Sequence, residues 1–170
     1  MQEPLKLAGV LLCAAGIIYF TFSLTARMRR RLRSIDRFLS ALCLMRSEIQ
    51  TRLSDLYDVF GMLAISSAPP LREFFESIAA AKTSPGRQMR ASLEEMRAEL
   101  CLGDQEYDTL CDLASSIGLY DAEAQLRDIN RAIARLEDAR LAAGADCSKK
   151  TKLYGTVGVS GALALVLILL

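Results

Sequence analysis

The sequence predicts an all-α fold: a bundle of about six helices, flanked by an N-terminal and a C-terminal transmembrane helix. Three observations lead to this prediction. The chain begins and ends with long uncharged runs, residues 7–26 and 153–170. Between them, apolar residues recur at steps of three and four, as they do on one face of a helix. Aromatic residues make up only 6% of the chain, and no strand pattern is visible.

The two uncharged runs are the first and last expected elements. They contain 20 and 18 residues. At about 1.5 Å of rise per residue, helices of these lengths span roughly 30 and 27 Å, close to the hydrocarbon thickness of a bilayer. A cleaved signal peptide would carry its positive charge before the first run, whereas here the arginines follow it. We therefore expect two uncleaved membrane helices.

Basic residues border both runs and predict their orientation. Since cytoplasmic flanks are rich in Lys and Arg, both termini are expected outside and the intervening chain in the cytoplasm. The position of the arginines favours topology and contact with anionic lipid, and no nucleic acid is expected as a partner. The flanking residues are Arg27, Arg29, Arg30, Arg31 and Arg33 after the first run, and Lys149, Lys150 and Lys152 before the second.

The chain therefore divides into four parts. Residues 1–26 form the first membrane helix, 27–33 a basic juxtamembrane collar, 34–148 an acidic helical bundle, and 149–170 a basic flank with the second membrane helix. Residues 34–148 hold 12 basic and 19 acidic residues, a net charge of −7, although the whole chain carries only +1. The charge is thus segregated along the sequence.

The first three body helices are expected at residues 34–53, from Ser54 to the break at Ala68, and at 71–81. Ser54 is expected to cap the second helix, and Pro69-Pro70 separates it from the third. Their predicted apolar faces are Ile35, Phe38, Leu39, Leu42, Met45, Ile49 and Leu53; Leu56, Val59, Phe60 and Leu63; and Leu71, Phe74, Phe75 and Ile78.

The last three body helices are expected at 87–100, from Asp104 to Gly118, and from Asp121 to about residue 145. Ser84 and Asp121 are expected as caps, Pro85 at a first helical position, and Gly118 in a left-handed conformation that ends its helix. Their predicted apolar faces are Met89, Leu93, Met96 and Leu100; Tyr107, Leu110, Cys111, Ala114 and Ile117; and Gln125, Leu126, Ile129, Ile133 and Leu136.

The sequence shows none of the residue patterns that are typical of a catalytic or metal site. The chain has no histidine, and its five cysteines form no CxxC pair, so a zinc site is not expected. No glycine-rich phosphate loop and no nucleophile–base pair is recognisable. We expect a protein without enzymatic activity or cofactor, with reduced thiols in a cytoplasmic compartment.

Small residues recur at intervals along both predicted membrane helices. Such residues let helix backbones approach closely in lipid, which predicts packing against other membrane proteins or in a homo-oligomer. Glycine is also common in membrane helices in general, so the alternative is that these residues have no specific role. They are Gly9, Cys13 and Gly16 in the first helix, and Gly155, Gly158, Gly161 and Ala162 in the second.

Acidic residues dominate the stretch between Arg97 and Arg127, which contains no basic residue. One interpretation is a solvated face with acidic helix starts, which the helix dipole favours. The other is a docking surface for a basic partner, because complementary charge steers encounter. The candidate docking residues are Glu99, Asp104, Glu106, Asp108, Asp112, Asp121 and Glu123.

The layout and several residues resemble the stage III sporulation protein AB family of endospore-forming bacteria. The resemblance covers essentially the whole chain. It departs at Asp55, where the family favours a proline. The matching points are the arginine cluster, Glu48-Ile49, Ser54 and Leu56, Gly118, Asp121, Gln125 and Ile129, and Lys152-Leu153-Tyr154 with Gly158 and Gly161.

This resemblance implies a non-enzymatic scaffold in the mother-cell membrane, within the channel-like complex that connects mother cell and forespore. The body would resemble the cytoplasmic domains of type II secretion and type IV pilus platform proteins, which contact a secretion ATPase. The implied partner is the ATPase subunit of the sporulation complex, stage III sporulation protein AA, together with other membrane proteins of that complex. The alternative is a small membrane signalling receptor with a helical output domain.

Overall fold

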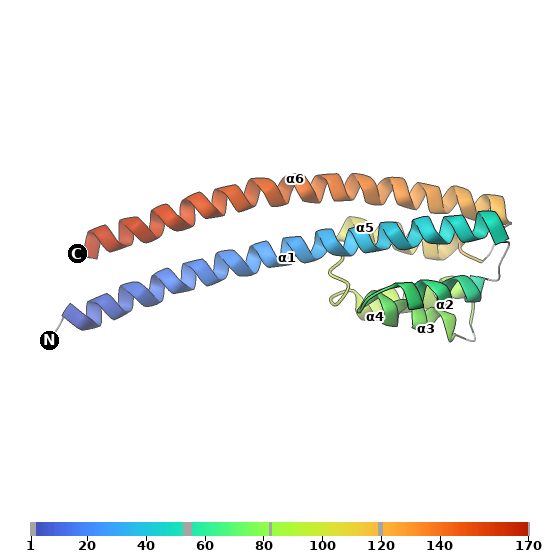
Figure 1. Ribbon diagram of the computed structural model, residues 1–170, viewed down its shortest axis with the longest axis horizontal. Coiled ribbons are helices and arrows are strands. Elements are labelled where there is room, and N and C mark those ends of the chain that lie inside the picture. Colours follow the sequence, from blue (N-terminus) through green and yellow to red (C-terminus); the bar gives the residue numbers. More distant parts are fainter. Residues whose placement is uncertain (1–2, 53–55, 82, 119–120, 170) are drawn as a thin grey trace. The chain divides into compact units, whose positions relative to one another are not determined.

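The computed structural model describes residues 3–52, 56–81, 83–118 and 121–169, without side chains for residues 3–15, 17, 18, 20, 21, 52 and 151–169. The described chain is all-helical, as predicted, with six helices and no strand (Figure 1). The helices are α1 (Glu3–Arg52), α2 (Leu56–Ser66), α3 (Leu71–Ala79), α4 (Pro85–Met96), α5 (Asp104–Ser116) and α6 (Ala122–Leu169).

The chain forms two compact units. We call Met1–Arg30 together with Ala143–Leu170 the terminal unit, and Arg31–Ala142 the body. The terminal unit consists of the N-terminal part of α1 and the C-terminal part of α6, which run antiparallel, so that both chain ends lie at the same end of this unit (Figure 1). The body contains α2 to α5 and the remaining parts of α1 and α6.

The two end helices are longer than the sequence pattern predicted. We expected a separate membrane helix and body helix at each end, but α1 continues through the basic collar and α6 continues through Lys149 and Lys150. Residues 27–33 and 145–152 contain no Gly or Pro, and Arg and Lys are good helix formers, so nothing in these segments ends a helix. The predicted segments therefore merge into six helices.

Several predicted helix boundaries are confirmed. The Asp121 carboxylate accepts a hydrogen bond of 2.8 Å from the backbone N–H of Ala124, and α6 begins directly after it. Gly118 has a φ of +79°, the left-handed conformation expected at the end of α5. Pro85 is the first residue of α4, as predicted, but Ser84 at its N-cap makes no side-chain capping bond, contrary to the expectation. The expected cap Ser54 lies outside the described residues.

The helix α4 ends earlier than predicted. It stops at Met96 rather than at Leu100, and the chain continues in turns to Cys101, which has a φ of +52°. Leu100 is nevertheless buried, because this turn folds it back into the core. The prediction was right about the apolar face and wrong about the helical end.

The core of the body consists of the predicted apolar faces. Rings from three helices form its centre: Phe38 meets Phe74 edge-on at 5.7 Å between centroids, and Phe75 lies 5.2 Å from Phe74 and 6.2 Å from Phe60. Most residues of the predicted faces are buried, including Ile35, Leu42, Met45, Ile49, Val59, Leu63, Leu71, Ile78, Met89, Leu93, Leu110, Cys111, Ala114, Ile117, Ile129, Ile133 and Leu136. Others of the predicted faces are only partly buried: Leu39, Leu56, Met96, Tyr107, Gln125 and Leu126. Leu53 lies outside the described residues.

Polar contacts connect the helices around this core. Arg46 donates a hydrogen bond of 3.1 Å to Asn130, and Arg140 forms an ion pair with Asp36; both contacts join α1 to α6. The hydroxyls of Ser77 and Ser92 lie 2.7 Å apart and join α3 to α4. These bonds add polar links between the helices of the body.

Candidate functional site

The acidic stretch around α5 is the candidate docking surface, and the structure assigns its carboxylates very different surroundings. Arginines that are distant in sequence reach this stretch from α1 and α6, and Arg97 reaches it from the turn after α4. The absence of basic residues between Arg97 and Arg127 therefore does not produce an uncompensated acidic surface. Each carboxylate has to be considered by its contacts.

Glu106 is the clearest correction to the sequence interpretation. Its side chain is 0% exposed, and Arg31 donates hydrogen bonds of 2.8 and 3.0 Å to its two oxygens. Glu106 therefore cannot belong to an exposed docking surface, because its charge is neutralised inside the body. Gly103 leaves the space for this pair, since a Cβ at Gly103 would lie 2.5 Å from the Arg31 Nη2 atom.

Asp104 belongs to a small network at the start of α5. Arg97 forms an ion pair with Asp104 and also lies over the ring of Tyr107, 4.4 Å from its centroid. The Tyr107 hydroxyl donates a hydrogen bond to Glu94 on α4, and this bond is the main cause that raises the pKa of Tyr107 above its ordinary value. The network joins the end of α4 to the start of α5.

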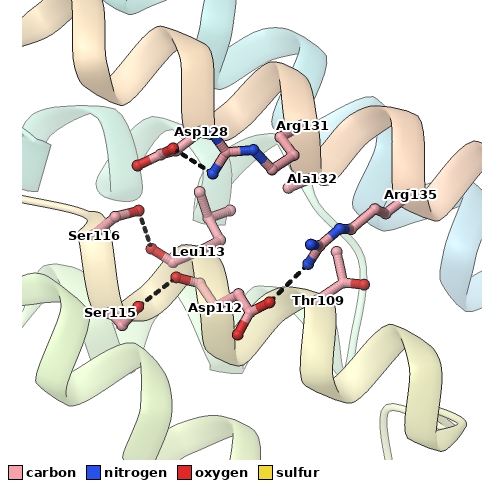
Figure 2. A pocket seen from close by; sticks show the side chains of 9 residues that line it. All are labelled: Thr109, Asp112, Leu113, Ser115, Ser116, Asp128, Arg131, Ala132 and Arg135. Carbon is pink, nitrogen blue, oxygen red and sulfur yellow. Dashed lines mark hydrogen bonds and ion pairs between the residues drawn. The ribbon is translucent and has the colours of Figure 1, made fainter.

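Asp112 lies on the rim of a polar groove between α5 and α6 (Figure 2). Arg135 donates a hydrogen bond of 2.7 Å to Asp112, and Arg131 pairs with Asp128 at 2.9 Å in the same groove. The groove has a volume of about 290 Å³, and Ser115 and Ser116 also line it. Its charges are paired with one another, so it presents no net charge to a ligand.

The two acidic residues at the start of α6 interact with residues of that same helix. Asp121 caps it, and Glu123 lies 3.8 Å from Arg127, four residues later. Carboxylates at a helix start are favoured by the helix dipole, which was the alternative interpretation given for the acidic stretch.

Glu99 and Asp108 remain as exposed carboxylates without a polar partner in the described part of the chain. Glu95 on α4 is likewise exposed and unpaired there. Glu95 lies on α4, Glu99 in the turns that follow it, and Asp108 on the neighbouring helix α5. We call Glu95, Glu99 and Asp108 the acidic face.

The basic flanking residues also differ from one another. Arg27, Arg29, Arg30, Lys149 and Lys150 are exposed in the terminal unit, and Arg33 is exposed in the body. Arg31 instead belongs to the buried pair with Glu106. The side chain of Lys152 is not among those that the structure describes.

Most of the small residues predicted to pack in the membrane lie outside the described side chains: Gly9, Cys13, Gly155, Gly158, Gly161 and Ala162. Gly16 is described. It is exposed, and a Cβ built on it would meet no atom within 4 Å. Gly16 therefore does not mark a close approach of two helices within the chain, and its predicted packing against another protein or a second copy stays a prediction.

Two exposed rings in the terminal unit were not singled out from the sequence. Tyr19 is 77% exposed and Phe22 is 75% exposed, three residues apart on α1. Their position inside an uncharged run was the available signal, but periodicity cannot show which side of a uniformly apolar helix is covered.

Among the residues whose side chains the structure describes, no helix is both long enough and apolar enough to span a bilayer. In the same ranges, no group of three or more His, Cys, Asp or Glu side chains could hold a metal ion. The described cysteines Cys43, Cys101, Cys111 and Cys147 are free thiols.

Comparison with known proteins gives consistent results. The model of the family described as stage III sporulation protein AB matches residues 6–170. Stage III sporulation protein AB of Bacillus subtilis (strain 168) is 24% identical over 174 residues, covering 98% of this chain and 99% of the relative. A solved structure of a stage III sporulation protein AB has a similar fold, with a TM-score of 0.65 and 23% identity, covering 70% of this chain and 97% of the other.

Proposed function

The chain belongs to the stage III sporulation protein AB family, and from this we propose that it is a non-enzymatic scaffold of a sporulation complex. In this proposal it is anchored in the mother-cell membrane facing the forespore. Its acidic helical body lies in the cytoplasm and docks a secretion-type ATPase subunit, stage III sporulation protein AA. Other membrane proteins of the same complex would contact its membrane helices.

The organisation of the terminal unit supports the membrane anchor. Its two helical segments are antiparallel, and each carries an uncharged run toward the chain end and basic residues toward the body. Because the basic residues stay on the cytoplasmic side, this arrangement suits two spans with both termini outside. The exposed rings of Tyr19 and Phe22 within the first run favour an apolar surrounding.

The observation that carries the docking proposal is the contrast among the carboxylates. Glu106, Asp104 and Asp112 are neutralised by arginines of the same chain. By contrast, Glu99 and Asp108 are exposed and unpaired in the described residues, and Glu95 adds a further free charge. Charges that no internal partner neutralises are the ones that can steer a basic surface of another protein.

The test is binding of the full-length chain, in detergent or nanodiscs, to the purified ATPase subunit. The variant Glu99→Lys/Asp108→Lys should weaken binding by about ten-fold, and the remaining affinity should depend less on salt. Asp112 is left unchanged because a lysine there would face Arg135 and disturb the packing of α5 on α6.

The matched control is Glu73→Lys/Glu76→Lys, which makes the same charge change at exposed positions on α3. This control should bind like the unmodified chain. Equal losses in both double variants would indicate a general effect of net charge, and no loss in the first would rule out the acidic face as the docking surface.

A further inference from the structure

We propose that the terminal unit binds anionic phospholipid headgroups through Arg27 and Arg30, with the rings of Tyr19 and Phe22 at the boundary between headgroups and acyl chains. This inference rests on the membrane anchoring proposed above. It goes beyond the general lipid contact expected of the basic collar by assigning a headgroup site to particular side chains.

Only some arginines of the basic collar are available to a ligand. Of the five in the collar, Arg31 is committed to Glu106, and Arg29 and Arg33 make other interactions within the chain. Arg27 and Arg30 are exposed and have no polar partner in the described part of the chain. Two guanidinium groups are therefore open to a ligand from outside the chain.

The two free arginines share one face of α1 with the two exposed rings. At about 100° per residue, Tyr19, Phe22, Arg27 and Arg30 all fall within one sector of less than half the helix circumference. All four side chains are exposed, and so is Ser23 in the same sector. Because the helix rises about 1.5 Å per residue, Arg27 lies roughly 7.5 Å further along the axis than Phe22. One open face thus changes from aromatic to cationic within about a turn and a half.

The combination of guanidinium groups and aromatic rings on this face indicates which ligand it binds. A guanidinium forms paired hydrogen bonds with phosphate oxygens, and aromatic rings are favoured at the interface between headgroups and hydrocarbon. A basic residue close to an anionic leaflet gains about five-fold in binding, the equivalent of roughly 1 kcal/mol. α6 adds the exposed Lys149 and Lys150 to the same unit. A soluble anion would not account for the neighbouring exposed rings, whereas a phospholipid accounts for both.

The experiment uses the absence of tryptophan from the chain. A Phe22→Trp variant then contains one such fluorophore, placed in the proposed lipid contact. The full-length variant is reconstituted in phosphatidylcholine vesicles with a small fraction of lipid brominated in its acyl chains, either phosphatidylglycerol or phosphatidylcholine. Bromine quenches tryptophan at short range, so the ratio of the two quenching constants measures the local preference for the anionic lipid.

Brominated phosphatidylglycerol should quench about five-fold more effectively than brominated phosphatidylcholine at equal fraction, and added salt should reduce this ratio. In the same background, Arg27→Gln/Arg30→Gln should bring the ratio close to one. The matched control Arg87→Gln/Arg90→Gln removes two exposed arginines of α4 in the body and should leave the ratio unchanged.

A ratio near one in the parent variant, or an equal decrease in both double variants, would overturn the lipid site. If the ratio is near one but Arg27→Gln/Arg30→Gln abolishes binding of another membrane protein, the occupant is that protein and the proposal is wrong. If neither brominated lipid quenches at all, residue 22 does not contact the bilayer, and the membrane anchoring itself fails. The failures of the two proposals are thus distinguishable.

Discussion

The Nη2 atom of Arg31 lies 2.8 Å from Oε1 and 3.0 Å from Oε2 of Glu106, a carboxylate whose side chain is completely buried. The two residues are 75 positions apart and join α1 to α5. The pair takes one arginine out of the basic collar and one glutamate out of the acidic stretch. A buried carboxylate is tolerated because its partner supplies both charge and hydrogen bonds.

Removing the arginine should destabilise the body strongly. Arg31→Met leaves the Glu106 carboxylate buried and unpaired, and should cost about 3 kcal/mol, the lower end for a broken buried pair because Arg31 is itself 40% exposed. The double variant Arg31→Met/Glu106→Leu should recover most of this loss. Thermal unfolding of the full-length chain in detergent, followed by circular dichroism, measures both values.

Arg87→Met, at an exposed position on α4, is the control and should change the free energy of unfolding by less than about 0.5 kcal/mol. If Arg31→Met were as mild as this control, the pair would contribute nothing to the fold.

A glycine should be needed at position 103 because a side chain there would clash with the Arg31–Glu106 pair, and not because of the backbone conformation of Gly103. Its φ of −79° suits any residue, but a Cβ would lie 2.5 Å from Arg31 Nη2 and closer still to a Glu106 oxygen. Gly103→Ala should therefore cost roughly 1–3 kcal/mol. In the Arg31→Met/Glu106→Leu background this cost should largely vanish, which unfolding measurements of the four variants can establish.

Gly61 provides a control of opposite sign. It lies within α2, and a Cβ there would meet no atom within 4 Å. Gly61→Ala should stabilise the chain by about 0.5–1 kcal/mol, since alanine loses less backbone entropy in a helix. A destabilising effect at Gly61, or an unchanged cost of Gly103→Ala without the pair, would contradict this explanation.

Gly86 should tolerate no side chain. A Cβ there would lie 3.0 Å from the carbonyl oxygen of Ile117 and even closer to that of Ala114. Backbone atoms cannot move aside as a side chain can, so Gly86→Ala has to separate α4 from α5. We expect a loss of about 2–3 kcal/mol in the free energy of unfolding. A loss no larger than about 0.5 kcal/mol would show that the two helices are less closely packed than described.

Asp121 should contribute through its capping bond to Ala124. Asp121→Ala should destabilise the chain by about 1 kcal/mol, because an N–H at the start of α6 loses its acceptor. Asp138→Ala removes an exposed aspartate from the interior of α6, where alanine is the better helix former, and should be neutral or slightly stabilising. Equal effects of the two variants in thermal unfolding would argue against a capping role.

Local signals predicted much of the fold. The period of three and four in residues such as Phe38, Leu63 and Ile133 marked side chains that are buried, because a helix in a bundle must cover its apolar face. Asp121 and Gly118 were recognisable because capping and left-handed glycine depend on neighbouring residues only.

The contacts of the charged residues were not predictable in this way. Nothing near Glu106 in the sequence indicates that Arg31 will neutralise it, and the same holds for Asp112 and Arg135, which are 23 positions apart. Counting charges along the chain therefore overestimated the acidic surface. The continuity of α1 through the collar was missed because a change in charge was taken for a boundary, although a charged segment without Gly or Pro does not end a helix.

The membrane topology of the intact chain tests the proposed two-span anchor most directly. We expect the protein to stay with membranes during alkaline carbonate extraction. We also expect a tag fused after Leu170 to be labelled by a membrane-impermeant reagent added on the non-cytoplasmic side of the membrane, whereas the exposed thiol of Cys43 should react only after the membrane is opened. A protein that carbonate releases, or a tag that is reached only from the cytoplasm, would contradict the two-span anchor on which the proposed scaffold depends.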